Sequence, residues 1–214
     1  MSHLDKIDLS AKAIGAVNTI VNRDGKLWGY NTDTLGIEYA FRNIILYNKN
    51  VLLIGAGGAG LAVAYVVTKQ GGKCSYVDHT LSKMQLLQKK FGGKVIPIEN
   101  LKKLLAKDID IIINASPVGM YSDKKNSTRN SIDNSPVPAE LINQHQIVFD
   151  LVYNPIETEL IKLAKKKGAQ IITGLDMFVA QGLYQVQIWI GKKKLIISEK
   201  LINKIKVELK KKLK

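Results

Sequence analysis

The hydrophobic positions of this chain alternate between short, continuous apolar runs and longer segments with helical spacing. Buried parallel strands are predicted where the apolar runs are short, at Val51–Ile54, Lys73–Val77, Lys94–Ile96, Ile109–Ile113, Ile147–Leu151 and Gln170–Ile172. Helices are predicted between them, over Gly58–Gln70, Leu81–Phe91, Glu99–Ala106 and Glu157–Lys167. Six strands joined by helical crossovers are typical of an α/β fold with a doubly wound parallel sheet.

The first part of the chain has a different pattern. Ala16–Val21 and Lys26–Tyr30 predict two strands, and the Asp24-Gly25 pair between them predicts a hairpin turn. Thr34–Ile45 has helical spacing, with Asp33 or Thr34 placed to cap the helix. Residues 1–46 are therefore expected to form a unit separate from the parallel sheet of residues 47–174.

Two further helices are predicted in residues 175–214, over Leu175–Ile190 and about Ser198–Lys212. The second has an apolar stripe on one face and lysines on the other. We interpret it as a surface helix packed on a core, with a helix lying on a membrane surface as the weaker alternative. The polar segment Tyr121–Ser135 is expected to be a mobile loop.

Composition narrows the range of partners. The chain has 32 basic and 18 acidic residues, a net charge of +14, so nucleic acid must be considered. Only Arg23, Arg42 and Arg129 are arginines, the residue type whose forked contacts read phosphates and guanines, so we expect no nucleic-acid partner. The single cysteine, Cys74, fits a reducing cytoplasm. No signal region, membrane span or metal site is expected.

A glycine-rich segment directly follows the first predicted parallel strand. Its spacing is G-x-G-x-x-G, and a helix is predicted to begin within it, which is the context of a dinucleotide-binding (Rossmann-type) loop. Glycines at these positions permit a tight turn, close approach of a pyrophosphate and packing of helix on strand. The predicted cofactor-binding residues of this loop are Gly55, Ala56, Gly57, Gly58, Ala59 and Gly60.

Asp78 ends the second predicted parallel strand, near the offset at which a carboxylate binds the adenosine ribose. A carboxylate there accepts hydrogen bonds from both ribose hydroxyls and repels a 2′-phosphate. The residues therefore favour NAD over NADP. The alternative interpretation is that Asp78 is an ordinary aspartate at a strand end with no role in cofactor binding.

Several segments occur in a fixed order along the chain. They read Gly-Ala-Val-Asn-Thr at 15–19, Gly-Tyr-Asn-Thr-Asp at 29–33, Asn-Ala-Ser-Pro-Val-Gly-Met at 114–120, Asp-Leu-Val-Tyr-Asn-Pro at 150–155, and Gly-Leu-Asp-Met at 174–177 with Gln-Gly at 181–182. Together, from about Leu4 to Trp189, they resemble the shikimate dehydrogenase family, whose members reduce 3-dehydroshikimate with NADPH.

The resemblance implies roles for single residues. Asn18, Asp33, Tyr153 and Gln181 match family positions that contact substrate, and Asp33 matches the partner of the catalytic lysine. Cofactor contacts are implied for Asn114, Leu151 and Gly174, and for the triplet Asp78-His79-Thr80. The resemblance also implies that residues 1–46 are the remnant of an α/β substrate domain, to which residues 175–214 return.

Two departures from the family pattern change the expectations. The family grips the 2′-phosphate with an N-R-T triplet, but His79 replaces its arginine and Asp78 its asparagine. The resemblance also implies that the chain is truncated, because Met1–Ile14 matches the stretch that follows the family's lysine segment N-V-T-x-P-x-K. We therefore expect the chain to bind dinucleotide but to reduce dehydroshikimate weakly, since general acid–base catalysis contributes roughly 10²–10⁴ in rate.

Three functions stay open on the sequence. The first is an NAD(P)-dependent oxidoreductase of the shikimate dehydrogenase type in aromatic amino acid biosynthesis, with shikimate or 3-dehydroshikimate as its small-molecule substrate. The second is a non-catalytic dinucleotide-binding fragment, and the third is a quinate/shikimate dehydrogenase that uses NAD. The sequence does not predict an oligomeric state.

Overall fold

The computed structural model describes residues 1–121, 134–191 and 195–213. Its main feature is a six-stranded sheet in which every neighbouring pair is parallel, in the order β6-β5-β4-β7-β8-β9. The strands are β4 (Asn50–Ile54), β5 (Lys73–Val77), β6 (Lys94–Val95), β7 (Ile111–Asn114), β8 (Ile147–Asp150) and β9 (Gln170–Thr173). This confirms the predicted doubly wound α/β fold.

Alternate residues of the central strands serve two separate cores, as the two faces of a sheet require. In β4, Val51 and Leu53 join one core and Leu52 joins the other. The first core includes residues of α3 (Gly58–Lys69) and α4 (Leu81–Phe91), and the second includes residues of α5 (Glu159–Lys166) and the short turns η1 (Ile98–Lys103) and η4 (Ala139–Leu141).

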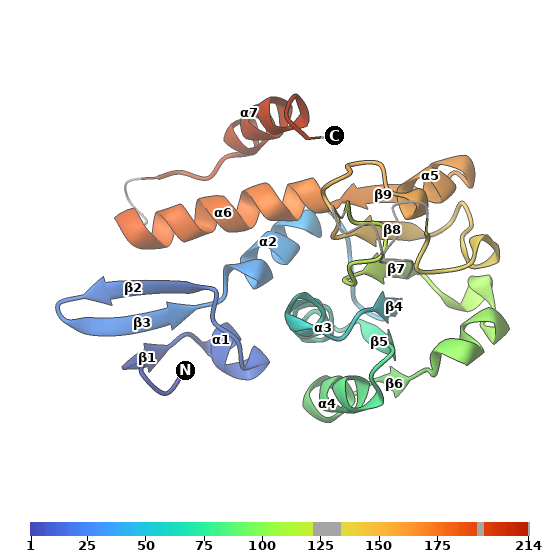
Figure 1. Ribbon diagram of the computed structural model, residues 1–214, viewed down its shortest axis with the longest axis horizontal. Helices are drawn as coiled ribbons and strands as arrows, with labels where there is room; N and C mark the ends of the chain where they lie inside the picture. Colours follow the sequence, from blue (N-terminus) through green and yellow to red (C-terminus); the bar gives the residue numbers. More distant parts are fainter. Residues whose placement is uncertain (122–133, 192–194, 214) are drawn as a thin grey trace.

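A second, three-stranded sheet lies at the N-terminal end, with strand order β1-β3-β2. β2 (Thr19–Arg23) and β3 (Lys26–Tyr30) form the predicted hairpin, and β1 (Lys6–Ile7) pairs parallel with β3. The short helix α1 (Leu9–Ile14) and the helix α2 (Thr32–Ala40) flank this sheet, and α2 leads into the parallel sheet (Figure 1).

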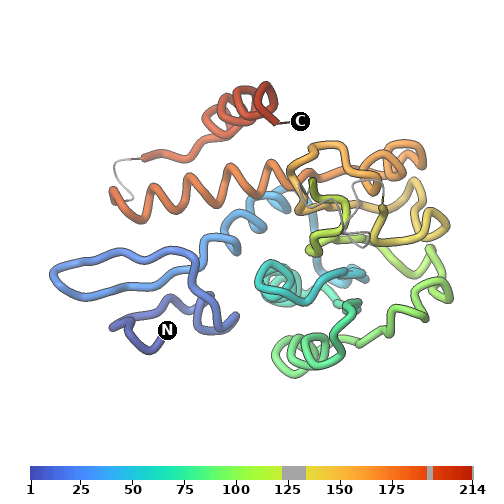
Figure 2. The backbone as a smooth tube through the Cα atoms, viewed as in Figure 1, coloured from blue at the N-terminus to red at the C-terminus, as the bar shows by residue number. Residues whose placement is uncertain are grey.

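The first C-terminal helix connects the two sheets, and the second packs on it. α6 (Gly174–Ile190) begins directly after β9, runs beside α2 and reaches β2, as the tube in Figure 2 also shows. α7 (Glu199–Lys210) packs on α6 through a small apolar core around Ile202, and Lys206 forms an ion pair with Asp176. This packing supports the interpretation of α7 as a surface helix. No helix in the described ranges has the length and apolar character needed to cross a membrane.

Three predictions about local structure were wrong. Glu99–Ala106 is not an α-helix: it forms η1 and the start of η2 (Ala106–Asp108), because only Leu101 is buried there and Leu105 is 56% exposed. Asn31, rather than Asp33 or Thr34, caps α2 by accepting from the Asp33 N–H at 3.1 Å.

The third wrong prediction concerns the C-terminal end of the helix after β3. α2 ends at Ala40 instead of Ile45, because the chain must turn there to enter β4, and Asn48 takes a left-handed φ of 59° in that turn. The expected mobile loop at 121–135 falls largely outside the described residues.

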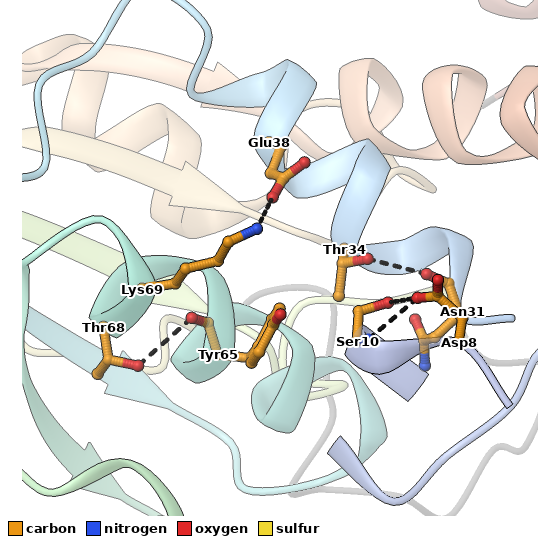
Figure 3. Close-up of polar contacts among 8 residues, drawn as sticks. All are labelled: Asp8, Ser10, Asn31, Thr34, Glu38, Tyr65, Thr68 and Lys69. Atoms are coloured by element: carbon orange, nitrogen blue, oxygen red, sulfur yellow. Dashed lines mark hydrogen bonds and ion pairs between the residues drawn. The ribbon is translucent and has the colours of Figure 1, made fainter. Parts of the chain in front are cut away.

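A very close helix contact joins α2 to α6 at Gly36. A Cβ on Gly36 would lie 2.7 Å from the Met177 carbonyl oxygen and 2.9 Å from the Gln181 Cβ. A side chain at this position would therefore push the two helices apart. A second link on the other side of α2 is the ion pair between Glu38 and Lys69 of α3, 3.4 Å long (Figure 3).

Gly36→Ala is expected to lower the free energy of unfolding by about 1–3 kcal/mol through overpacking, although alanine has the higher helix propensity. Gly182→Ala is the matched control, because Gly182 lies in α6 and a Cβ there would meet nothing within 4 Å. Urea unfolding monitored by circular dichroism measures both. Equal midpoints for the two variants would contradict the close contact at Gly36.

Candidate active site

The four glycines of residues 55–60 divide into two kinds. Gly55 has a φ of 98°, and a Cβ on it would lie 2.6 Å from the Ala115 carbonyl carbon. A Cβ on Gly60 would lie 2.1 Å from the Gly55 carbonyl oxygen. The fold itself therefore requires Gly55 and Gly60. Added Cβ atoms on Gly57 and Gly58 would meet nothing within 4 Å, so these two keep the loop surface open.

The helix that begins in this loop has no side-chain cap. Gly57 is the N-cap of α3 and forms no side-chain cap hydrogen bond, whereas α1, α2, α5 and α7 are capped by Asp8, Asn31, Thr158 and Ser198. The first N–H groups of a helix have no partner within the helix and carry partial positive charge. The open loop surface and these N–H groups fit the phosphates of a dinucleotide.

Asp78 holds the glycine loop against the next strand. One carboxylate oxygen accepts from the Ala56 N–H at 2.7 Å, and the other accepts from the Thr80 N–H at 2.8 Å. A carboxylate can accept about four hydrogen bonds, so it retains capacity for ribose hydroxyls. His79 and Thr80 are exposed beside it, and α4 begins after Thr80 without a side-chain cap.

The carboxyl ends of β7 and β8 are joined by a buried polar cluster. The Asn114 amide donates to the Asp150 carboxylate at 2.9 Å, and the Thr158 hydroxyl donates to the same carboxylate at 2.6 Å. The Asn114 amide oxygen accepts from the backbone and side chain of Ser116. Burial raises the pKa of Asp150 to about 6 against the opposing effect of these donors. Asn114 therefore shapes the loop after β7.

The start of α6 closes against the loop after β8. A Cβ on Gly174 would lie 2.2 Å from the Leu151 carbonyl oxygen. This approach brings Leu151 and Gly174 together at the same edge of the sheet as the glycine loop, since Leu151 donates its N–H to the Asn114 carbonyl at 2.9 Å. The predicted cofactor residues thus all lie along the carboxyl edge of the parallel sheet.

A second polar cluster forms where the three-stranded sheet meets the first turn of α2. The Asn18 amide oxygen accepts from the Thr32 N–H at 2.9 Å and from the Thr19 hydroxyl at 2.8 Å. The Thr32 hydroxyl also donates to the Gln181 amide oxygen at 3.2 Å, across from α2 to α6. Asn18 and Gln181, predicted from distant segments, are thus brought together through Thr32.

Asp33 stands in the first turn of α2 with its carboxylate next to Asn18. Burial raises the pKa of Asp33 above its ordinary value, and a hydrogen bond with the Asn18 side chain partly lowers it again. In the described part of the chain, no lysine or arginine nitrogen lies within 4.0 Å of this carboxylate. The raised pKa is in keeping with this lack of a neighbouring cation.

Tyr153 lies in the loop after β8 and contacts α6. Its ring is stacked on the ring of Phe178 of α6, with centroids 4.2 Å apart and planes 19° apart. Of the four predicted substrate residues, Gln181 lies in α6 and the other three lie in segments that α6 contacts. The sequence did not single out Thr19, Thr32, Gln185 or Phe178, and only the helical spacing of Phe178 and Gln185 relative to Gln181 could have indicated two of them.

Comparisons with known proteins agree with this geometry. A family model described as "Shikimate / quinate 5-dehydrogenase" matches residues 38–167. "Shikimate dehydrogenase (NADP(+))" from Methanococcus maripaludis strain C6 is 40% identical over 211 residues, which cover 95% of this chain and 72% of the relative. The protein of the same name from Methanocaldococcus jannaschii is 40% identical over 201 residues, which cover 89% of this chain and 68% of the relative.

Solved structures give the same result. A crystal structure of shikimate dehydrogenase in complex with NADP⁺ has a TM-score of 0.82 at 34% identity and covers 97% of this chain, which spans 71% of that chain. The Thermus thermophilus enzyme in complex with NADP(H) and shikimate has a TM-score of 0.78 at 31% identity, with coverage of 97% and 73%. On the family model and these relatives, the chain belongs to the shikimate/quinate dehydrogenase family.

Proposed function

We propose that this chain is the dinucleotide-binding and substrate-orienting part of an oxidoreductase that interconverts 3-dehydroshikimate and shikimate in the cytoplasm. The observation that carries the proposal is the position of α6. It begins at the carboxyl edge of the parallel sheet and contacts the polar cluster of Asn18, Thr32 and Asp33 about two turns later. Two half-sites that are far apart in the sequence are thereby connected by one rigid helix.

The dinucleotide half-site follows from the carboxyl edge of the sheet. Residues 55–60 would hold the pyrophosphate, and Asp78, His79 and Thr80 would hold the adenosine ribose. Leu151 and Gly174 would line the nicotinamide end of the half-site. Asn114 would hold the neighbouring loop in place through its buried hydrogen bonds to Val118 and Asp150. When bound, the nicotinamide supplies or accepts a hydride.

The substrate half-site uses hydrogen-bonding side chains, as a polyhydroxylated acid requires. Asn18 and Gln181 would orient hydroxyl groups, and Tyr153 would approach from the loop after β8. The Asp33 carboxylate would accept from the hydroxyl at the reacting carbon. Residues 1–46 and 175–214 together would form this side of the site, and residues 47–174 the other.

NAD is proposed to bind at least as well as NADP. The Asp78 carboxylate would lie beside a 2′-phosphate, while the ribose hydroxyls of NAD could donate to it. The family relatives above carry NADP in their names, whereas a Listeria monocytogenes shikimate 5-dehydrogenase structure at 29% identity and a TM-score of 0.79 is in complex with shikimate and NAD. An NAD-linked enzyme that acts on quinate as well as shikimate is the second candidate function.

Gly57→Ala tests the dinucleotide half-site. We expect the variant to unfold at the same urea concentration as the wild type, because the added Cβ meets no protein atom within 4 Å. Its affinity for NAD and NADP should fall at least about tenfold, since the methyl group occupies the space of the pyrophosphate. Calorimetric titration measures the affinity. Unchanged affinity in a folded variant would contradict the proposed phosphate site.

His79→Arg tests the cofactor preference. The wild type should bind NAD at least as tightly as NADP. The added guanidinium, next to the uncapped start of α4, should raise NADP affinity about tenfold and leave NAD affinity nearly unchanged, because a charge-assisted hydrogen bond contributes about 1.5–3 kcal/mol. His79→Gln is the matched uncharged control. Tighter NADP than NAD binding by the wild type would overturn the proposed preference.

The rate of turnover tests the role of Asp33. The chain should reduce dehydroshikimate about 10²–10⁴-fold more slowly than the relatives named above, because within the described residues Asp33 has no cationic partner to exchange a proton with the substrate. Loss of reduced-nicotinamide absorbance measures the rate. Dinucleotide binding without turnover would favour a non-catalytic binding module, and turnover equal to that of a relative would show that the described groups suffice.

A further inference from the structure

The stacked rings of Tyr153 and Phe178 stand between the two half-sites. Their centroids are 4.2 Å apart and their planes nearly parallel, at 19°. Both side chains remain partly exposed, 37% for Tyr153 and 36% for Phe178. Among the described residues, this aromatic pair belongs to none of the apolar cores, and along α6 it lies between the two polar clusters.

Phe178 belongs to a stripe of α6 whose members each contact a different part of the two half-sites. Gly174, Phe178, Gln181 and Gln185 are spaced three or four residues apart, which places them on one face of the helix. Gly174 meets the Leu151 carbonyl, Gln181 accepts from Thr32, and Gln185 donates to the Thr19 hydroxyl at 3.0 Å. Phe178 is the member of this stripe that meets Tyr153.

This position lies between the cofactor end and the substrate end of the helix. At 1.5 Å per residue, Phe178 is roughly 6 Å from Gly174 and roughly 5 Å from Gln181 along the helix axis. Tyr153, by contrast, lies in a loop, whose backbone is fixed on one side by the buried Asp150 cluster and on the other by a hydrogen bond from the Tyr121 N–H to the Asn154 carbonyl. The ring on α6 gives the Tyr153 side chain a rigid support.

We propose that Phe178 is a positioning residue: its ring holds the Tyr153 ring so that the tyrosine hydroxyl faces the substrate hydroxyls. This inference rests on the proposed function, because it assigns Tyr153 to the substrate half-site. Stacking fixes the plane of the tyrosine ring through its face, so Phe178 does not itself cover the ring edge that carries the hydroxyl. Phe178 acts through Tyr153 and makes no polar contact of its own with substrate.

The test is a double-mutant cycle on the 214-residue chain, with shikimate titrated by calorimetry in the presence of saturating NAD or NADP. Phe178→Ala should weaken shikimate binding about 3- to 10-fold, in line with the loss of one aromatic pair. Phe178→Tyr, which keeps the ring, should restore most of the affinity, whereas Phe178→Leu, which keeps only apolar volume, should not. In the Tyr153→Ala background, Phe178→Ala should have no further effect.

Three controls separate positioning from stability. The unfolding midpoint of Phe178→Ala should stay close to that of the wild type, because the ring lies outside the cores. Its dinucleotide affinity should also be unchanged. Val186→Ala, at a 39%-exposed position further along α6, should leave shikimate affinity unchanged.

The outcomes are distinct from those that test the proposed function. Equal shikimate affinity in wild type and Phe178→Ala overturns this inference, as does an undiminished effect of Phe178→Ala in the Tyr153→Ala background. A wild type that binds dinucleotide but no shikimate at millimolar concentration also overturns it, while the dinucleotide half-site stands. Failure to bind either ligand would remove the proposed function as well.

Discussion

The contact between α2 and α6 at Gly36 determines how the two parts of the molecule face each other. Because Gly36 has no side chain, the backbone of α2 lies against Met177 and Gln181 of α6. The same contact sets the distance over which Thr32 donates to Gln181. The position of the polar cluster of Asn18, Thr32 and Asp33 relative to α6 is therefore set by helix packing. The hydrogen bonds of the cluster act only between immediate neighbours.

Some helix N-termini have a side-chain cap and others do not, and three of the uncapped ones lie at the edge of the sheet proposed to bind the dinucleotide. α1, α2, α5 and α7 each have a side-chain cap, so the local sequence satisfies their first N–H groups. α3, α4 and α6 begin at the carboxyl edge of the parallel sheet without one, whereas α5 begins at the same edge with Thr158 as its cap. Uncapped N–H groups cost stability unless water or a ligand binds them. Their concentration at one edge is consistent with an anionic ligand there.

Much of the architecture could be predicted because its signals are local. The apolar runs of β4, β7 and β8 are buried on both faces, which makes them continuous in the sequence, and part of the glycine spacing reflects the close contact of Gly60 with Gly55 inside the loop. The segment at Glu99–Ala106 was predicted wrongly because a helix needs several buried positions, and there only Leu101 is buried. The apolar residues of this segment do have helical spacing, but a helix there would have no core to pack against.

The site was only partly predictable for a related reason. Asn18, Asp33, Tyr153 and Gln181 were predicted through the family resemblance, which gives their order along the chain but not their contacts. Thr32 and Phe178 act through partners that are distant along the chain, Gln181 and Tyr153, and such pairings leave no pattern in a single sequence. The hydrogen bond of Asp78 to the glycine loop, which accompanies its proposed role as a ribose acceptor, is likewise visible only once the Ala56 N–H is placed.

The most direct measurement is a crystal structure of the chain with oxidised dinucleotide and shikimate bound together. The account predicts phosphates against the N–H groups of residues 57–60, shikimate hydroxyls against Asn18, Asp33 and Gln181, and the reacting carbons of the two ligands about 3–3.5 Å apart. Phosphates bound elsewhere on the molecule, or the two ligands held too far apart for hydride transfer, would contradict it.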